Sequence, residues 1–247
     1  MTAESFPITS GCQDHYSLLN SRCGEILVAS FAFDDAGQSR SHSYAQDLET
    51  WIAALDSRPE VELLKSALEV YQFGLLTVLQ GLYRQSFMSL RSFIELALGA
   101  VHFSGSELHL RQWLGDERDL SWQRIVDKDS GVFSAGFAKA FFAEAVEVAP
   151  EYDQIAGAVY RECSEYIHGN SLRISALPSG LQFDSAAFSS WHEIAESAYL
   201  VVTFALCVRY LKFLDDRSRN ALEAVILDVV GHVPAIRAFY GAPVESG

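Results

Sequence analysis

The chain has 247 residues and carries 32 Asp and Glu residues against 18 Lys and Arg residues, which gives a formal net charge of −14. Its hydrophobic share of 49% is that of a globular protein with a sizeable core and excludes a disordered chain. The acidic surplus argues against broad, nonspecific binding of RNA or DNA, because such binding needs Lys and Arg side chains to neutralise phosphates. A local basic site stays compatible with this balance.

The first 42 residues differ in pattern from the rest of the chain. They contain an apolar, β-like run over Glu25–Phe33, followed by a turn-rich stretch over Asp34–Ser43. This pattern predicts a small N-terminal hairpin or arm (residues 1–42) that packs on a main body formed by residues 43–247. The N-terminus lacks a basic segment followed by an apolar run, so we expect no signal peptide.

Helical periodicity dominates from Ser43 onward. Ser43 can cap a helix that continues to Leu55, and Pro59 can begin the next helix. Apolar residues then recur at helical spacing as far as about Phe103. Because a helix of that length is unusual in a globular domain, we expect a kink or break near Gly81.

The remainder of the chain is also predicted to be mainly helical. The helix predicted over 151–168 ends at Gly169-Asn170, which are typical helix-stop residues. After it, Pro178-Ser-Gly180 within Leu172–Phe183 favours a short hairpin or extended loop. The predicted fold class is therefore all-α, a helical bundle with small β decorations. The further helices are expected over 107–114, 133–148, 151–168, 187–214 and 217–230.

No sequence pattern points to a metal, a cofactor or a membrane. There is no Cys/His cluster at zinc spacing, no phosphate-binding glycine loop and no EF-hand, so we expect neither metal nor cofactor. The longest uncharged stretches, Val70–Tyr83 and Ser197–Val208, are shorter than the roughly 18 residues needed to span a bilayer. We therefore expect no membrane partner and a cytoplasmic location. The cysteines are spread along the chain as small core residues of a reducing compartment would be: Cys12, Cys23, Cys163 and Cys207.

The segment Tyr160–Asn170 carries the most informative polar residues. Arg161 and His168 are seven residues apart, which places them on one helix face, about 20° from exact alignment. Ser164 and Glu165 lie between them on that face. Roughly 10 Å separates the two positions along the axis, which is long for a site within one helix. A second copy of the chain or another helix would let two such faces bracket one phosphate.

A second polar stripe occurs earlier in the chain. Arg91 and Glu95 are four residues apart in the segment Leu90-Arg-Ser-Phe-Ile-Glu-Leu96, and Arg84 and His102 continue the same helix face. The stripe is either a functional face or a buried ion-pair seam. An Arg–Glu pair at this spacing is more often a plain intrahelical ion pair than a catalytic one.

Together the two segments resemble the HEPN family of helical domains. The Arg161–His168 segment is similar to the Arg-x(4–6)-His motif of that family, here followed by His-Gly. The Leu90–Leu96 segment resembles the Leu-Arg-Ser-x-x-Glu helix found upstream in one branch of it. The resemblance extends from the helix near Tyr71 to the long helix after Ala187 and implies an HEPN-like bundle in which the two polar helices face each other.

The resemblance also implies a function. HEPN domains with this motif are commonly metal-independent endoribonucleases that act as dimers, many of them in toxin–antitoxin systems or antiphage defence. By this resemblance, His168 would act as general base or acid at the ribose 2′-OH, and Arg161 would stabilise charge on the phosphate. A homodimer, a specific RNA substrate, and a protein antitoxin or other complex partner would follow. The supporting site residues would be Arg91, Glu95, Ser164, Glu165 and Asn170.

Alternative interpretations of the same residues stay open. Next to the Gly-Asn stop, His168 can simply cap the C-terminus of its helix, where a cation is favoured. The acidic neighbours Glu162 and Glu165 would repel RNA from Arg161. The competing function is a non-catalytic HEPN-like helical module for protein interaction or ligand sensing, in which the Arg/His/Glu cluster holds the fold or a dimer together.

Overall fold

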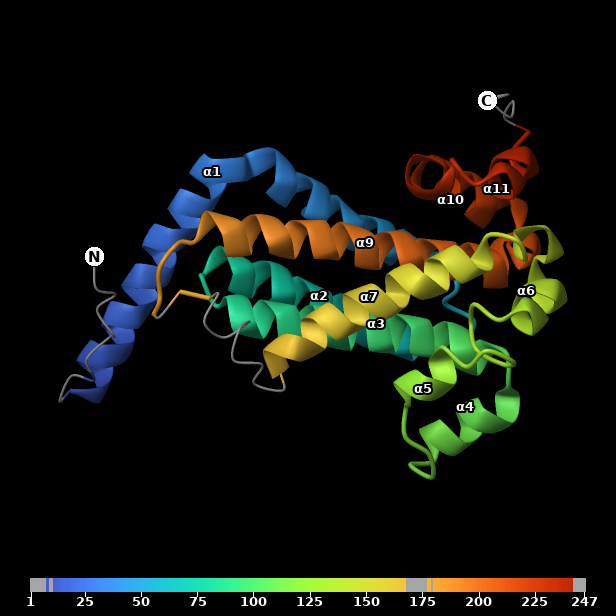
Figure 1. Cartoon of the computed structure of the whole chain (residues 1–247), viewed down its shortest axis with the longest axis horizontal. Coiled ribbons are helices and arrows are strands. Elements are labelled where there is room, and N and C mark those ends of the chain that lie inside the picture. Colours follow the sequence, from blue (N-terminus) through green and yellow to red (C-terminus); the bar gives the residue numbers. More distant parts are fainter. Residues whose placement is uncertain (1–7, 9–10, 168–176, 179, 242–247) are drawn as a thin grey trace.

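The computed structural model describes residues 8, 11–167, 177–178 and 180–241 of the chain. Within these residues the regular secondary structure is helical and includes no strand, which confirms the all-α fold class. Five long helices build the molecule and run side by side, except that the first half of the first one extends away from the others at an angle (Figure 1). They are α1 (Cys12–Ala54), α2 (Val61–Leu79), α3 (Tyr83–Ser104), α7 (Ala149–Ile167) and α9 (Ser185–Tyr210).

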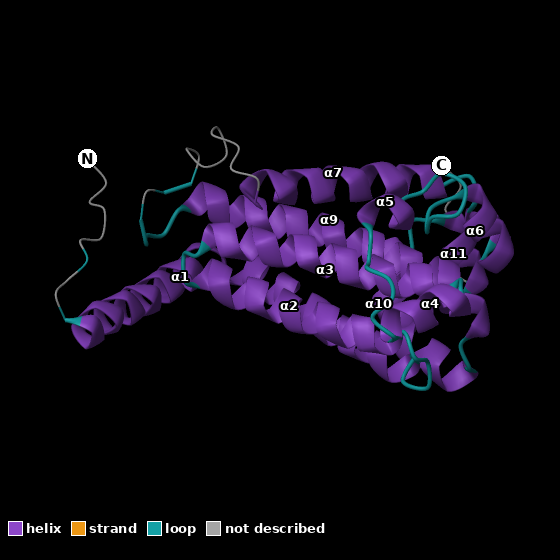
Figure 2. Ribbon diagram, turned by 90° about the horizontal axis from the view of Figure 1, so that it is seen from below, coloured by secondary structure: helices purple, strands orange, loops and turns teal. Residues whose placement is uncertain are grey.

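Shorter elements gather at the end of the bundle that is remote from the N-terminus, where the last described residues of the chain also lie (Figures 1 and 2). Ser106 caps α4, and Asp215 caps α10, each through a side-chain oxygen that accepts a backbone N–H. These elements are α4 (Glu107–Leu114), α5 (Trp122–Ile125), α6 (Ala135–Phe141), the 3₁₀ turns η1 (Ala143–Ala145) and η2 (Leu211–Phe213), α10 (Asp216–Val230) and α11 (Pro234–Phe239).

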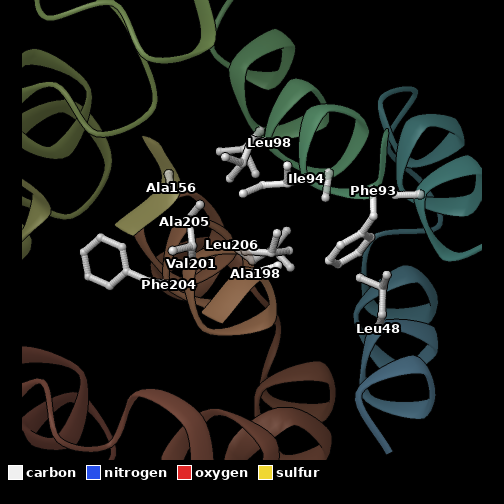
Figure 3. Packing of buried hydrophobic residues seen from close by; sticks show 14 of the residues in the cluster. Leu48, Phe93, Ile94, Leu98, Ala156, Ala198, Val201, Phe204, Ala205 and Leu206 are labelled. Atoms are coloured by element: carbon white, nitrogen blue, oxygen red, sulfur yellow. The ribbon is translucent and has the colours of Figure 1, made fainter. Parts of the chain in front are cut away.

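Helix α9 is the central helix of the bundle and contacts α1, α3, α7 and α10. Its buried positions include many small residues, so that neighbouring helices can approach it closely. Figure 3 shows these side chains between α3 and α7, with Ala205 near Ala156 of α7. By length and composition the segment Ser185–Phe213 could cross a membrane, but 83% of its most apolar window is buried inside the protein. That burial is what the core helix of a soluble protein shows.

The predicted break near Gly81 is confirmed. Helix α2 ends at Leu79 and α3 begins at Tyr83, and Gly81 between them has a φ of 75°. Only glycine adopts this backbone conformation without strain. A Cβ here would also lie 3.0 Å from Ile26 Cδ1 and 3.2 Å from the carbonyl oxygen of Gln182. The sharp turn folds α3 back along α2, and the two helices form an extensive antiparallel hairpin.

The predicted β-like N-terminal arm is wrong. Residues Glu25–Phe33 belong to helix α1, and the proposed division at residue 42 falls inside the same helix, where Ser43 is an interior residue rather than a cap. The backbone breaks instead at Asp34 (φ −151°, ψ 80°). Its Oδ1 accepts the backbone N–H of Gly37 at 2.8 Å, so Asp34 acts as the N-cap of the second half of α1.

The physical reason for this error lies in the residues that α1 buries. Its buried positions recur at helical spacing, but several carry polar or very small side chains, among them Ser30, Gly37, Gln38 and Ser41. A search for apolar periodicity misses such a helix. The apolar residues that suggested a strand include Val28 and Phe33, which are exposed on its surface.

The other predicted helices agree with the structure to within a few residues at their starts. Helix α4 has the predicted bounds, and α7, α9 and α10 each begin within two residues of the predicted positions. Within the predicted segment 133–148, the structure forms α6 and η1 instead of one helix. The hairpin expected over Leu172–Phe183 lies mainly outside the described residues, and residues 180–183 are loop.

Candidate functional site

The predicted polar stripe on α3 lies against α7, in a seam that also receives α5. Arg91 Nη2 donates a hydrogen bond to the Tyr160 hydroxyl at 2.6 Å and lies 3.4 Å from Glu95 Oε1. The Arg91 guanidinium carbon is 4.8 Å from the centre of the Tyr160 ring. Trp122 of α5 stacks on that ring at 4.0 Å. The stripe is therefore a half-buried cluster that fixes α7 on α3, with the side chains of Arg91 and Glu95 exposed by only 20% and 26%.

The electrostatics of this cluster follow from its partial burial. Desolvation raises the pKa of the Glu95 carboxyl above its ordinary value, and the nearby Arg91 cation and a hydrogen bond with Tyr160 offset part of that shift. Arg91 Nε is buried and has no hydrogen-bond partner among the described residues. The cluster thus uses most of its polar atoms internally.

Arg84 and Phe87, on the first turns of α3, hold the end of α7. Arg84 Nε donates to the carbonyl oxygen of Tyr166 at 3.0 Å, and its Nη2 lies 3.5 Å from that of Ile167. A cation at the last carbonyls of a helix is favoured by the helix dipole. The rings of Phe87 and Tyr166 stack at 4.0 Å with an interplanar angle of 2°. These contacts fix the backbone that leads directly to His168, which with Asn170 lies outside the described residues.

The opposite face of α7 presents Arg161 to solvent. Within the described part of the chain, Arg161 is exposed and forms no hydrogen bond or ion pair. Gln154 and Ala158 are exposed on the same face, and a Cβ added at Gly157 would meet no atom within 4 Å. We call these four positions the outer face of α7. They form a surface of small and polar residues, on which Arg161 has no partner among the described residues.

The predicted site residues Ser164 and Glu165 lie between these two faces and are half-buried, as is the neighbouring Glu162. Ser164 Oγ donates to the carbonyl oxygen of Tyr160 at 2.6 Å, which is a local bond within the helix. The structure therefore brings Arg91 and Glu95 together with Tyr160 and separates them from the exposed Arg161.

Tyr160 is the residue that the sequence analysis passed over. It connects the two predicted segments, because its hydroxyl and its ring both contact Arg91. The available signal was its position four residues before Ser164 on one side of a helix, but the spacing alone does not say which side turns toward α3.

A second polar cluster joins α1 to α9. Ser41 Oγ and His192 Nδ1 are 2.6 Å apart, and burial lowers the pKa of His192 to about 4, so the ring is neutral near pH 7. A serine beside a histidine suggests a nucleophile. However, Ser41 is only 2% exposed and lies within α1, whose backbone N–H groups bond within the helix and offer no oxyanion hole. This cluster is a buried polar contact between helices.

Metal ligands do not gather anywhere in the part of the chain that the structure describes. No group of three or more His, Cys, Asp and Glu side chains there could hold a metal ion. The cysteines are free, and burial raises the pKa of the Cys163 thiol to about 12. A thiol held neutral in this way is a packing residue and not a nucleophile.

Comparison with known proteins gives no match to a family model, to a curated protein or to a solved structure. The resemblance to the HEPN family therefore depends on the two sequence segments. The packing of α3 against α7 is compatible with that resemblance, since it sets the two segments side by side.

Proposed function

We propose that the protein is a metal-independent endoribonuclease of the HEPN type that acts as a homodimer through the outer face of α7. The observation that carries this proposal is Arg161, an exposed cation on an otherwise shallow helix face with no partner among the described residues. An arginine that stabilised the fold would contact a carboxylate, a carbonyl group or an aromatic ring, as Arg91 and Arg84 do.

The chemistry assigned to this face needs two groups. The guanidinium of Arg161 binds the non-bridging oxygens of the scissile phosphate and stabilises the charge that develops on them. His168 accepts the proton of the ribose 2′-OH as the 2′-oxygen attacks phosphorus. The bond to the 5′-oxygen breaks, that oxygen takes up a proton, and the RNA is left with a 2′,3′-cyclic phosphate. The reaction as proposed uses no metal ion.

A dimer is part of this proposal because of the spacing between the two groups. The sequence spacing of Arg161 and His168 corresponds to roughly 10 Å along a helix, so one copy alone is expected to bracket a phosphate poorly. Two outer faces packed together would place the arginine of one copy near the histidine of the other. Gly157 and Ala158 have little side-chain volume and would let two such helices approach closely.

The net charge of the chain limits the kinds of RNA that it could bind as a substrate. With a net charge of −14, the protein cannot hold RNA along a broad basic surface. We expect a structured RNA that is contacted at a few points, and we assign the protein to the cytoplasm as a toxin or antiphage effector with a protein antitoxin or other complex partner.

The test is RNA cleavage by the purified chain in excess EDTA, with total RNA and tRNA as substrates. Arg161→Ala should reduce cleavage by a factor of at least about 10², the scale of losing one transition-state contact. Its melting temperature should match that of the wild type, because Arg161 is exposed and has no partner among the described residues. Arg217→Ala, which removes an exposed arginine on α10, is the matched control and should leave cleavage unchanged.

Two outcomes would contradict the proposal. One is a wild-type protein that cleaves neither substrate while Arg161→Ala lowers the melting temperature, because Arg161 would then be structural. The other is a protein that sediments only as a monomer at tens of micromolar, because a composite site could then not form.

The second candidate is a non-catalytic helical module for protein interaction or ligand sensing. It is favoured by the Arg91–Glu95–Tyr160 cluster, whose polar groups hold α3 and α7 together and leave little to act on a substrate. Under this function the outer face of α7 binds a protein partner, and Arg161→Ala weakens that complex without any cleavage activity in the wild type.

A further inference from the structure

A cavity of about 690 Å³ lies between the helices α1 and α2. Residues from both helices line it, and it belongs neither to the α3–α7 seam nor to the outer face of α7. Its volume lies within the range of about 300–1,000 Å³ that is usual for small-molecule sites. The two helices that form it can be followed in Figure 1.

One wall of the cavity is apolar. Leu75, Leu76 and Leu79 of α2 contribute it, and Phe31 of α1 stands at its edge. Phe31 and Leu76 remain exposed by 39% and 46%, although side chains of this size gain free energy from burial. An apolar surface of this kind favours a flat or compact apolar group over water.

The rest of the lining is polar. Glutamine amides from both helices (Gln38, Gln46 and Gln72) are joined by Ser39 and His42. Among the residues that the structure describes, no Asp, Glu, Lys or Arg lines this cavity. In a chain with 50 such charged residues (32 acidic and 18 basic), that composition selects a neutral ligand.

Gln38 supplies an independent sign of a ligand. The residue lines the cavity but is only 5% exposed, and its Oε1 is buried without a hydrogen-bond partner among the described residues. A buried acceptor without a donor costs free energy, and native structures rarely leave one in place. Because Oε1 is closed off from the cavity in this structure, a ligand N–H or O–H group would complete it once the Gln38 amide turns toward the cavity.

We propose that this cavity is a binding site for a neutral small molecule with a flat apolar body and an N–H or O–H donor, such as an aromatic amine or a heteroaromatic amide. The apolar body packs against the leucines of α2, and the donor bonds to Gln38. This site is separate from the proposed ribonuclease face and does not depend on it.

The first experiment uses N-phenyl-1-naphthylamine, a neutral fluorescent dye with one N–H donor. Titration of the whole protein should give saturable fluorescence with one dye per chain. Leu76→Trp fills the cavity with a larger side chain and should weaken binding at least about tenfold, since it removes most of the contact area of the dye. Leu108→Trp is the matched control, because it alters an exposed leucine on α4, and it should leave the affinity unchanged.

The second experiment isolates the hydrogen bond. 1-Phenylnaphthalene has a similar aromatic body and no N–H, and its affinity is measured by displacement of the dye. The wild type should prefer the amine by about fivefold, the scale of one neutral hydrogen bond. Gln38→Leu should remove that preference, whatever its effect on the common affinity for the aromatic body.

Four results would overturn the proposal. Three concern affinity: the absence of saturable binding, equal affinities in wild type and Leu76→Trp, and a preference for the amine that survives in Gln38→Leu. Binding of one dye per two chains that accompanies association would assign the cavity to an interface between copies, which would also overturn it.

Discussion

The inner face of α7 sets Tyr160 and Tyr166 in ring stacks against α5 and α3, whereas Arg161, next to Tyr160 in the chain, is exposed and unpaired among the described residues. One helix therefore separates two tasks by its rotation of about 100° per residue. The inner face has its polar groups engaged and contributes stability. The outer face contributes little to the fold of one chain, so its arginine is available for an RNA or a protein partner.

The strongest test of this difference removes a ring from the inner face. Tyr166→Ala should lower the free energy of unfolding by about 3–5 kcal/mol, because a large buried side chain is lost from a site that cannot fully collapse. Tyr166 is only 5% exposed and stacks on Phe87. Urea denaturation followed by circular dichroism measures the change, and Tyr166→Phe, which keeps the ring, should retain most of the stability. A loss below about 1 kcal/mol would mean that α7 is held mainly by other contacts.

A smaller effect is expected at the charged residues of α3 that contact this inner face. Arg91→Ala should cost about 1–3 kcal/mol, because it leaves the half-buried carboxylate of Glu95 and the hydroxyl of Tyr160 without their cationic partner. Arg91→Lys keeps the charge but lacks the planar group that lies over the Tyr160 ring. Its stability should therefore fall between that of Arg91→Ala and that of the wild type. Equal stability of Arg91→Ala and the wild type would show that the cluster is no more than a surface ion pair.

The ionisation of Glu95 should make the stability of the chain depend on pH. Burial raises the pKa of this carboxyl above 4.5, so the folded chain holds the proton at higher pH than the unfolded chain does. Its contribution to stability is full below about pH 4.5 and is lost as the pH rises through the raised value. Glu95→Gln is neutral at every pH, so its stability relative to the wild type should increase across that window. Urea titrations from about pH 4 to about pH 7 measure the difference. A relative stability that falls with rising pH would contradict the direction of the shift.

The smallest effect is expected on the outer face. Gln154→Ala should change the free energy of unfolding by less than about 0.5 kcal/mol, because the side chain is exposed. The measurement is made at low protein concentration and repeated at high concentration. A larger loss that appears only at high concentration would show that a second copy covers this face, as the proposed dimer requires.

The sequence was most informative where the backbone demands a particular residue. Gly81 has a positive φ that favours glycine, and the break there was predicted. Asp34 also ends one helical segment and begins another, but the turn-forming residues after it suggested a loop, whereas they continue α1. The helix was missed because Ser30, Gln38 and Ser41 are buried, and a search for apolar periodicity does not detect buried polar residues.

The candidate site was predictable in its helices but not in its contacts. The helical spacing of Arg91 and Glu95 correctly gave one stripe on α3, whereas Ser164, which was expected on the face of Arg161, is half-buried. Which rotation of α7 turns toward α3 depends on tertiary packing. Tyr160 settles it, because Arg91 and Trp122 both contact its side chain.

The contacts around the Gly81 turn have a consequence for the order in which the chain folds. The α2–α3 hairpin is closed by residues 80–82 alone, so forming it costs little chain entropy. The contacts that complete this end of the bundle join distant segments: Arg84 bonds to Tyr166, 82 residues away, and Arg22 bonds to Leu181, 159 residues away. Such loops close slowly, and contacts of this kind are acquired after local ones. The last turn of α7 should therefore be secured late in folding, on a hairpin that is already in place, and amide hydrogens there should exchange with solvent sooner than those of α2 and α3.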